Sequence, residues 1–297
     1  MATLDLLNAE AFARLYPEQY FEKFISQSVR PDGRPLARSR PTSIGLGAVS
    51  AADSSALVKV GSATALAGIK CEVMQAADDA PDQGRITVQV ELSPLCSAST
   101  RPGRPSEAAQ VLTEQMTTVL ESSAFVDLKQ LCIDPGRAAW AVYVDIYVLD
   151  ADGSLHDVCL LAMAAALSTL VLQPAIVDEA GNVVRPEQVN GSSNGTAQQA
   201  QQRQRLQLGS LPVSLTCGLY GDKVIVDLTA EEERLVDSVV VTTVDATGDI
   251  LGMLKPGGRA TMSLDRLQDC IEAAKMRHAD VQAILQQSLD AFFEAAS

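Results

Sequence analysis

Apolar and polar positions in the first half of the chain repeat with the periods of helices and strands. Apolar residues at three- and four-residue spacing predict two short helices within residues 3–27, divided near Pro17. Alternating residues predict a hairpin of strands at 56–60 and 64–70. Four further elements are expected: a strand at 86–92, a helix from an N-cap at Ser106 to about Ser122, a strand at 138–149, and a helix at 156–172 that is apolar nearly all round.

The second half predicts several strands followed by one long helix. Four strands are expected, at 211–219, 223–228, 238–244 and 249–254. An acidic turn at 229–233 separates the second strand from the third. Apolar residues at helical spacing over 264–292 predict a long amphipathic helix. His278 lies on the apolar stripe of this helix, so we interpret it as a packed histidine rather than a catalytic one.

This order of elements predicts an α+β or mixed fold with two halves, each a sheet backed by helices. A stretch rich in Gly, Ser, Asn and Gln at 187–210 has low complexity and is expected to be a mobile loop between the halves. We therefore divide the chain into an N-terminal helical segment (1–29), a first half (30–186), the loop (187–210) and a second half (211–297).

Composition and charge limit the functions that this chain can have. It has 297 residues, of which 47% are hydrophobic, so it can bury a sizeable core. The formal net charge is −14 and the pI is near 4.5. Charge of this sign repels phosphate backbones at long range. We therefore do not expect an autonomous nucleic-acid-binding protein, and contacts to RNA would need local basic patches or partner subunits.

Cysteine usage and the apolar segments point to a soluble intracellular protein. The six cysteines are scattered, without a Cys-x-x-Cys pair, and are interpreted as buried thiols of a reducing compartment rather than zinc ligands. The N-terminus lacks the basic start and apolar core of a signal peptide. The longest apolar run, 158–172, is shorter than the roughly 20 residues that span a bilayer.

Two groups of charged residues are candidates for chemistry. The loop arginines Arg101 and Arg104 precede a helix N-terminus, where they are suited to contact a phosphate, although exposed loop arginines explain them equally well. Five carboxylates in the second half suit either a Mg²⁺ site or a solvated turn between strands. They are Asp227, Glu231, Glu232, Glu233 and Asp237. The sequence contains no P-loop, Gly-x-Ser-x-Gly or Gly-x-Gly-x-x-Gly motif.

Several segments together resemble a known family. They are Arg30-Pro-Asp-Gly-Arg34, Asp53-Ser-Ser-Ala-Leu-Val-Lys-Val-Gly61, Leu92-Ser-Pro-Leu-Cys96, Glu107-Ala-Ala-Gln110, Leu149-Asp-Ala-Asp-Gly153, Ile225-Val-Asp-Leu-Thr-Ala-Glu-Glu-Glu233 and Lys255-Pro-Gly-Gly258. In this order and spacing they resemble the RNase PH family, and specifically the RNase PH-like ring subunits of the eukaryotic RNA exosome. The resemblance covers about residues 20–285. It is greatest to the component eight type, and the component seven and nine types stay open.

The resemblance implies a subunit that does no chemistry. Active members cleave RNA from the 3′ end by phosphorolysis and hold phosphate and RNA with arginines. Where the family places arginines, this chain has Gln110, Glu114 and His156. Asp237 falls close to the position of the family's acidic residue. This chain lacks the arginines that act together with that residue in active members. The resemblance therefore implies a non-catalytic protein that needs no metal and no cofactor.

A structural role in the exosome ring is the function that the resemblance implies. The expected partners are the other RNase PH-like subunits, the S1/KH cap subunits and RNA in the central channel, where Arg101 and Arg104 are candidate contacts. The expected location is the nucleus, nucleolus and cytoplasm. Two alternatives stay open: an active phosphorolytic 3′-to-5′ exoribonuclease with Asp237 as catalytic acid, and a scaffold module unrelated to RNA.

Overall fold

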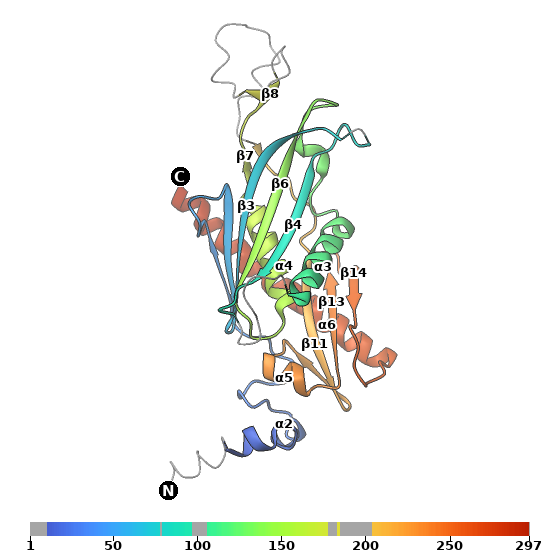
Figure 1. Ribbon diagram of the computed structural model, residues 1–297. Coiled ribbons are helices and arrows are strands. Elements are labelled where there is room, and N and C mark those ends of the chain that lie inside the picture. The colour runs from blue at the N-terminus through green and yellow to red at the C-terminus, as the bar shows by residue number, and fades with distance from the viewer. Residues whose placement is uncertain (1–10, 78, 97–105, 178–182, 185–203, 297) are drawn as a thin grey trace.

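The structure is a computed structural model that contains two larger β-sheets packed around a central helix (Figure 1). It describes residues 11–77, 79–96, 106–177, 183–184 and 204–296. The larger sheet is drawn in the upper part of Figure 1, the smaller one lies at the lower right, and helix α2 (Pro17–Ser26) lies at the lower end. This arrangement confirms the predicted α+β fold.

The first sheet contains the strands predicted in the first half. It is formed by β1 (Thr42–Leu46), β2 (Ser54–Val60), β3 (Ala63–Gln75), β6 (Ala138–Asp150) and β4 (Arg85–Leu92), in that order. The short β5 (Cys132–Asp134) also pairs with β6. Strands β4 and β6 are parallel, and the other pairs are antiparallel. Strands β2 and β3 form the predicted hairpin, in which Gly61 adopts a positive φ of 61°.

The second sheet has four antiparallel strands in the order β12-β11-β13-β14. They are β11 (Val213–Tyr220), β12 (Lys223–Val226), β13 (Ser238–Val244) and β14 (Ile250–Leu254). All four lie where the sequence predicted strands. Strand β11 is buried along most of its length, because it packs against helices on both sides of the sheet.

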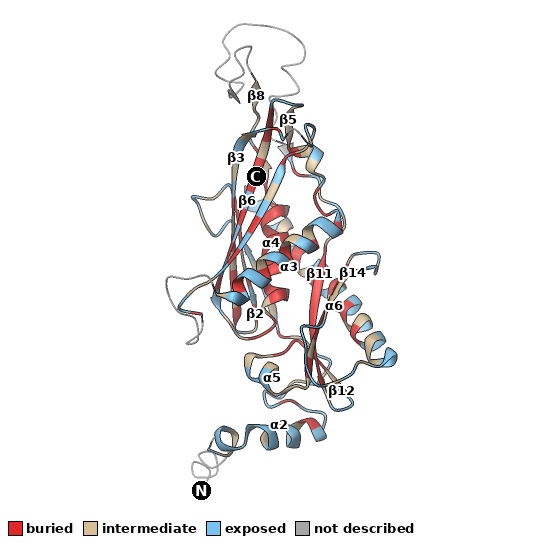
Figure 2. Ribbon diagram, turned by 45° about the vertical axis from the view of Figure 1, so that its right-hand side comes forward, coloured by how far each residue is buried: buried red, intermediate tan, exposed pale blue. Residues whose placement is uncertain are grey.

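Helix α4 (Leu155–Ser168) is the centre of the molecule. Almost every residue of this helix is buried, which agrees with its apolar sequence (Figure 2). It contacts strands of the first sheet and β11 of the second. One hydrophobic core therefore includes residues of both halves, among them Met163 in α4, Val213 in β11 and Val281 in the last helix.

Two further helices cover the sheets. Helix α3 (Glu107–Ser123) packs beside β4, and the hydroxyl of its predicted N-cap, Ser106, accepts a hydrogen bond from the backbone N–H of Ala109 at 3.1 Å. Helix α6 (Leu264–Ala296) contacts β1, β11 and β13. On α6, His278 is buried and its Nε2 lies 2.9 Å from the carbonyl oxygen of Leu211. The interpretation of His278 as a packed histidine is confirmed.

Two predicted boundaries are wrong. The helix predicted at 156–172 ends at Ser168, where the hydroxyls of Ser168 and Thr169 donate to helix carbonyls, and the chain continues as β7 (Val171–Leu172). The acidic turn predicted at 229–233 belongs to helix α5 (Ala230–Leu235). Thr229 and Glu232 form a capping box there, which starts a helix rather than a turn.

The segment that leads into the second sheet has two short strand pairs. β10 (Gln204–Arg205) pairs with β7, and β8 (Ile176–Val177) pairs with β9 (Val183–Val184). A 3₁₀ turn covers Leu128–Leu131. Of the predicted loop at 187–210, residues 187–203 lie outside the described residues. From 204 onward the chain contacts the first half, and the backbone N–H of Gly209 donates to the carbonyl of Phe125 at 2.8 Å.

All six cysteines lie in the described part of the chain, and none forms a disulfide. Four of them are buried and two, Cys71 and Cys132, are half-buried. The prediction that they are buried thiols therefore holds for four. Among the described helices, none combines the length and the apolar character that crossing a membrane requires.

Candidate functional site

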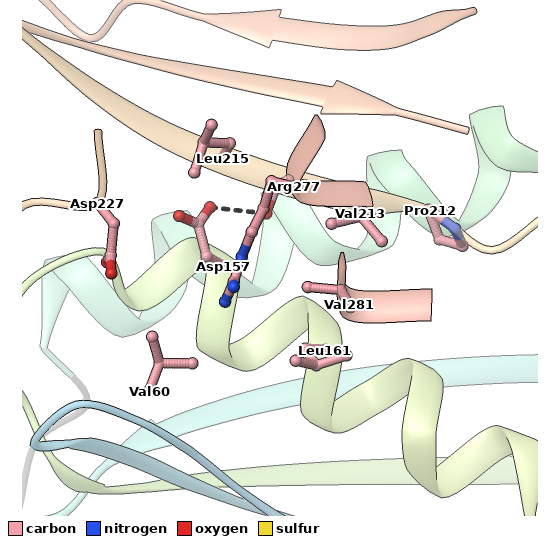
Figure 3. Close-up of a pocket in the computed structure, with 10 residues that line it drawn as sticks. Val60, Asp157, Leu161, Pro212, Val213, Leu215, Asp227, Arg277 and Val281 are labelled. Atoms are coloured by element: carbon pink, nitrogen blue, oxygen red, sulfur yellow. Dashed lines mark hydrogen bonds between the residues drawn. The ribbon is translucent and has the colours of Figure 1, made fainter. Parts of the chain in front are cut away.

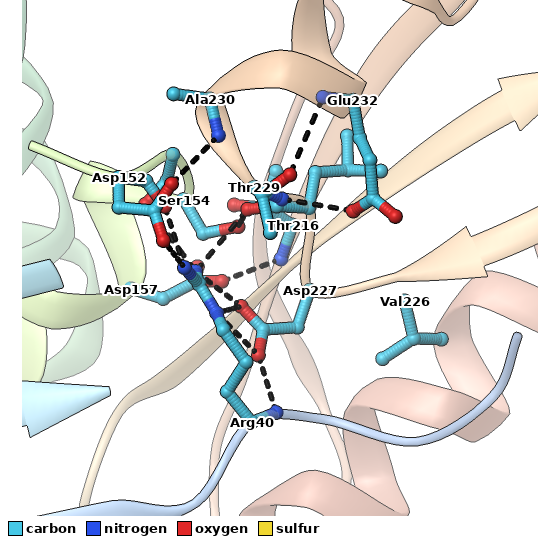
Figure 4. A network of polar contacts seen from close by, with 12 residues as sticks. Arg40, Asp152, Ser154, Asp157, Thr216, Val226, Asp227, Thr229, Ala230 and Glu232 are labelled. Atoms are coloured by element: carbon cyan, nitrogen blue, oxygen red, sulfur yellow. Dashed lines mark hydrogen bonds and ion pairs between the residues drawn. The ribbon is translucent and has the colours of Figure 1, made fainter. Parts of the chain in front are cut away.

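A buried network of charges joins the segment before β1 to both halves of the chain (Figure 4). The Asp227 carboxylate, which is only 2% exposed, follows β12. It accepts a hydrogen bond from the backbone N–H of Arg40 at 2.6 Å and another from Nη2 of Arg40 at 2.7 Å. Nη1 of the same guanidinium donates to the backbone carbonyl of Asp152, in the turn after β6. Arg40 therefore connects the turn that precedes α4 to the turn that precedes α5.

A second arginine lies beside the first. Arg30 is completely buried and donates from Nη2 to the backbone carbonyl of Val226 at 2.6 Å. Its Nε lies 3.3 Å from the Glu232 carboxylate. Burial raises the pKa of Asp227, but the hydrogen bonds and the positive charge of Arg40 outweigh this effect and hold the pKa below its ordinary value. The Arg40–Asp227 pair is therefore charged at neutral pH.

These pairs change the interpretation of the five carboxylates. Asp227 and Glu232 are buried against arginines, so they do not belong to a solvated turn. The guanidinium groups also occupy the positions that a bound cation would take beside these two carboxylates. Among the described residues, no cluster of histidine, cysteine and carboxylate side chains has the arrangement of a metal site. The network therefore acts as a permanent ionic connection between segments.

The four residues predicted to stand at the family's catalytic positions do not form a common site here. Gln110 and Glu114 lie one turn apart on the exposed surface of α3. His156 is buried at the start of α4, and Asp237 precedes β13 with Oδ2 accepting from the backbone N–H of Gly221 at 2.9 Å. Within the described chain no hydrogen bond or ion pair joins any two of these four side chains. Arg101 and Arg104 lie outside the described residues.

His156 cannot supply the positive charge of an arginine. Burial lowers its pKa to about 4, so the ring is neutral at physiological pH. Its Nδ1 lies 3.0 Å from the hydroxyl oxygen of Ser214, and that hydroxyl donates its single proton to Asp157 at 2.8 Å. The Nδ1 atom must therefore be the donor to the hydroxyl. This leaves Nε2 unprotonated and buried without a hydrogen-bond partner.

Asp157 connects α4 to the second sheet. Its carboxylate accepts a hydrogen bond from the Ser214 hydroxyl and another from the backbone N–H of Thr216 at 2.7 Å. Figure 3 shows Asp157 and Arg277 beside a small enclosed cavity of about 10 Å³, close to the volume that one water molecule needs. Burial raises the pKa of Asp157 to about 6 despite these hydrogen bonds.

The raised pKa of Asp157 predicts a change of stability with pH. The folded chain takes up a proton near pH 6, whereas the ordinary aspartate pKa is 3.8. This group therefore stabilises the fold most at low pH, and the contribution is lost as pH rises through 6. Between pH 7 and pH 5, we expect wild type to gain about 1 kcal/mol in free energy of unfolding relative to Asp157→Asn.

Urea unfolding of the full chain at several pH values measures this difference. The Ser214→Ala variant keeps the carboxyl group and is expected to keep the pH dependence. If the difference between wild type and Asp157→Asn does not change with pH, Asp157 does not titrate in this range.

Sequence reasoning missed most of the buried charges. It did not place Arg30 in the interior. It assigned no role to Arg40 or Asp157. Arg30, Asp227 and Glu232 lie in segments that resemble the family, whereas Arg40 and Asp157 lie outside those segments.

Comparison with known proteins accounts for the fold. Residues 38–173 match the model of the 3′ exoribonuclease family, domain 1, named RNase PH, and residues 210–277 match domain 2 of the same family. The chain belongs to this family. In this RNase PH family chain, the segment between the two matches lies between α4 and β11.

The individual relatives of this RNase PH family chain are exosome proteins. It is 34% identical over 273 residues to exosome complex component rrp43 of Schizosaccharomyces pombe, covering 90% of this chain and 94% of the relative. It is 31% identical over 266 residues to exosome complex component Rrp42 of Methanopyrus kandleri, covering 89% and 94%. A chain of the Archaeoglobus fulgidus exosome, solved with RNA bound to the active site, superposes with a TM-score of 0.76 at 28% identity. That superposition covers 90% of this chain and 96% of the other. The resemblance to exosome RNase PH-like subunits is therefore confirmed.

Proposed function

We propose that this chain is a non-catalytic ring subunit of an RNA exosome, which supports 3′-to-5′ RNA processing and degradation without cleaving RNA itself. Its RNase PH family membership and its exosome relatives support the ring assignment. They also argue against a scaffold unrelated to RNA, because the shared segments are not chance matches. The neighbours in the ring are then other RNase PH-like subunits, with S1/KH caps and RNA in the channel. The location that follows is the nucleus, nucleolus and cytoplasm.

One observation carries the proposal that the subunit is inactive. Glu114 occupies a position where active members of the family hold phosphate with arginine, and its side chain is exposed on α3. A carboxylate there repels both phosphate and RNA. Gln110 is uncharged and His156 is buried and neutral, so the remaining two positions do not compensate. Loss of such donors costs several kcal/mol of transition-state stabilisation.

The alternative of an active phosphorolytic exoribonuclease requires Asp237 to act as an acid near bound phosphate. Asp237 is half-buried, and its carboxylate is held by the backbone N–H of Gly221. None of the described arginines forms an ion pair with it. We therefore place this alternative second.

Affinity purification of the chain from its own cells, followed by an RNA degradation assay with and without phosphate, tests the function. We expect the other ring and cap subunits in the eluate and the same degradation activity from wild type and Asp237→Ala. Recovery of this chain alone, with phosphate-dependent shortening of RNA that Asp237→Ala abolishes, would identify an active enzyme.

A further inference from the structure

Two cysteines from distant parts of the chain share a small core between α6 and the second sheet. Cys217 lies in β11 and Cys270 lies in the second turn of α6, and both are 0% exposed. They belong to a hydrophobic cluster that is separate from the main core and that also contains Val226 and Ala274. Cys270 and Ala274 lie one helical turn apart on the same face of α6. Both are small residues, so the helix can approach β11 closely at this point.

The two thiols are in contact with each other. In the structure both are free, and the Cys217 thiol donates a hydrogen bond to the sulfur of Cys270. This hydrogen bond lowers the pKa of Cys270 below its ordinary value, against the effect of burial, and it raises the pKa of Cys217. Cys270 is therefore the thiol that loses its proton first, while Cys217 keeps its own. A thiolate beside a thiol is the arrangement from which a disulfide forms.

Three of the other cysteines have the opposite character. Burial raises the pKa of Cys71 and of Cys159 to about 12, and it also raises the pKa of Cys132. Such thiols stay protonated at neutral pH and react slowly with oxidants, because the thiolate is the reactive form. Cys159 is as completely buried as Cys270, so it provides a matched control inside the same protein.

The beginning of α6 gives a small oxidant a route to Cys270. The helix starts at Leu264, which is 69% exposed, and residues 264–269 are all exposed or half-buried. In Figure 1 this end of α6 lies at the lower right of the molecule. Helix ends open more readily than helix centres, because their first backbone N–H groups have no partner within the helix. Opening of the first two turns therefore uncovers Cys270 while the two sheets stay folded.

We propose that Cys217 and Cys270 form a reversible disulfide when the protein meets a peroxide, and that this bond fastens α6 to the second sheet. The Cys270 thiolate attacks one oxygen of hydrogen peroxide, the O–O bond breaks, and a sulfenic acid and a hydroxide ion form. The hydroxide takes up the proton that Cys270 lost earlier and becomes water. The sulfur of Cys217 then displaces the sulfenic oxygen, which leaves with the Cys217 proton as a second water. Two thiols are thus oxidised to one disulfide, and one peroxide is reduced to two waters.

The disulfide changes the stability of the second half of the chain. It closes a loop that contains β12, α5, β13 and β14. A disulfide stabilises mainly by restricting the unfolded chain, and the effect grows with the length of the closed loop. The oxidised protein therefore resists unfolding more than the reduced protein, and a thiol reductant reverses the change. This inference concerns the chain itself and does not depend on the proposed function.

Counting the free thiols of the full chain tests the proposal. Wild type, Cys270→Ala and Cys159→Ala are treated with hydrogen peroxide, the oxidant is removed, and free thiols are counted with a chromogenic disulfide reagent after denaturation. Peptide mapping by mass spectrometry without reduction then identifies the cysteines that are joined. Cys159→Ala is the matched control, because it removes an equally buried thiol from the main core.

We expect wild type to fall from six free thiols to four, Cys159→Ala to lose two as well, and Cys270→Ala to keep all five. Dithiothreitol should restore the lost thiols, and oxidation should raise the urea midpoint of wild type by about 1 M. Six free thiols in treated wild type would overturn the proposal. So would a disulfide between other cysteines or between two copies of the chain, or a loss that dithiothreitol does not reverse. If Cys270→Ala is insoluble, Cys217→Val tests the same bond and is expected to keep all five thiols.

Discussion

Arg40→Met is expected to lower the free energy of unfolding by about 3–5 kcal/mol, because it leaves the buried carboxylate of Asp227 without its main partner. The substitution keeps much of the apolar volume of the side chain and removes the charge. It also breaks the connection from Arg40 to the backbone carbonyl of Asp152. The nearest remaining cation is Arg34, whose Nη1 lies 3.6 Å from the Asp227 carboxylate. Urea unfolding of the full chain, followed by fluorescence of its single tryptophan, Trp140 in β6, measures the loss.

A second substitution distinguishes loss of the pair from loss of packing. Asp227 has a positive φ of 55°, a conformation that asparagine tolerates well, so Asp227→Asn removes the charge with little backbone strain. We expect the double variant Arg40→Met/Asp227→Asn to be more stable than Arg40→Met alone. Lys129→Met, which breaks the exposed ion pair with Asp82, is expected to cost less than about 1 kcal/mol. A double variant no more stable than Arg40→Met would show that the uncompensated charge is not the cause.

Gly153→Ala is expected to cost about 3 kcal/mol, because the turn after β6 passes against the turn after β12. Gly153 has a positive φ of 70°, and a Cβ atom there would lie 2.5 Å from the carbonyl oxygen of Leu228 and 2.7 Å from the backbone nitrogen of Ala230. Both neighbours are backbone atoms, so the clash is relieved only by separating the two turns. The left-handed conformation costs an alanine about 1 kcal/mol, and overpacking adds about 1–3 kcal/mol.

Gly136 provides a control with the same backbone conformation. Its φ is 75°, and a Cβ atom there would meet nothing within 4 Å. Gly136→Ala is therefore expected to cost only about 1 kcal/mol. Urea unfolding of the two variants compares them directly. Equal losses would mean that the contact between the two turns contributes nothing beyond the strain of a positive φ.

The order and type of the elements could be predicted from the sequence because their signals are local. The hairpin of β2 and β3, the N-cap at Ser106 and the apolar character of α4 all depend on residues that are close together in the chain. The two misplaced boundaries also have local causes. Hydroxyl groups that bond to helix carbonyls ended α4 at Ser168, and a capping box made a helix of residues that composition alone suggested were a turn.

The candidate site could be predicted only in part. The sequence predicted positions where the family's arginines are replaced, and the structure adds that His156 is buried and neutral and that Glu114 is exposed on α3. The sequence could not identify the pairs formed by Arg30 and Arg40. The partners of each arginine lie more than a hundred residues away along the chain. Whether an arginine is a surface charge or a buried connection depends on which distant carboxylate the fold brings to it.

The sequence by itself determined the family and the α+β order of elements, because motifs, periodicity and residue identity are properties of short segments. The tertiary structure decided which charges are buried and which strands lie at the edges of the sheets. It also decided that α4 packs in a single core that contains residues of both halves. These properties depend on contacts between distant segments, whose free energies arise only when the chain has folded and water has been excluded from between them.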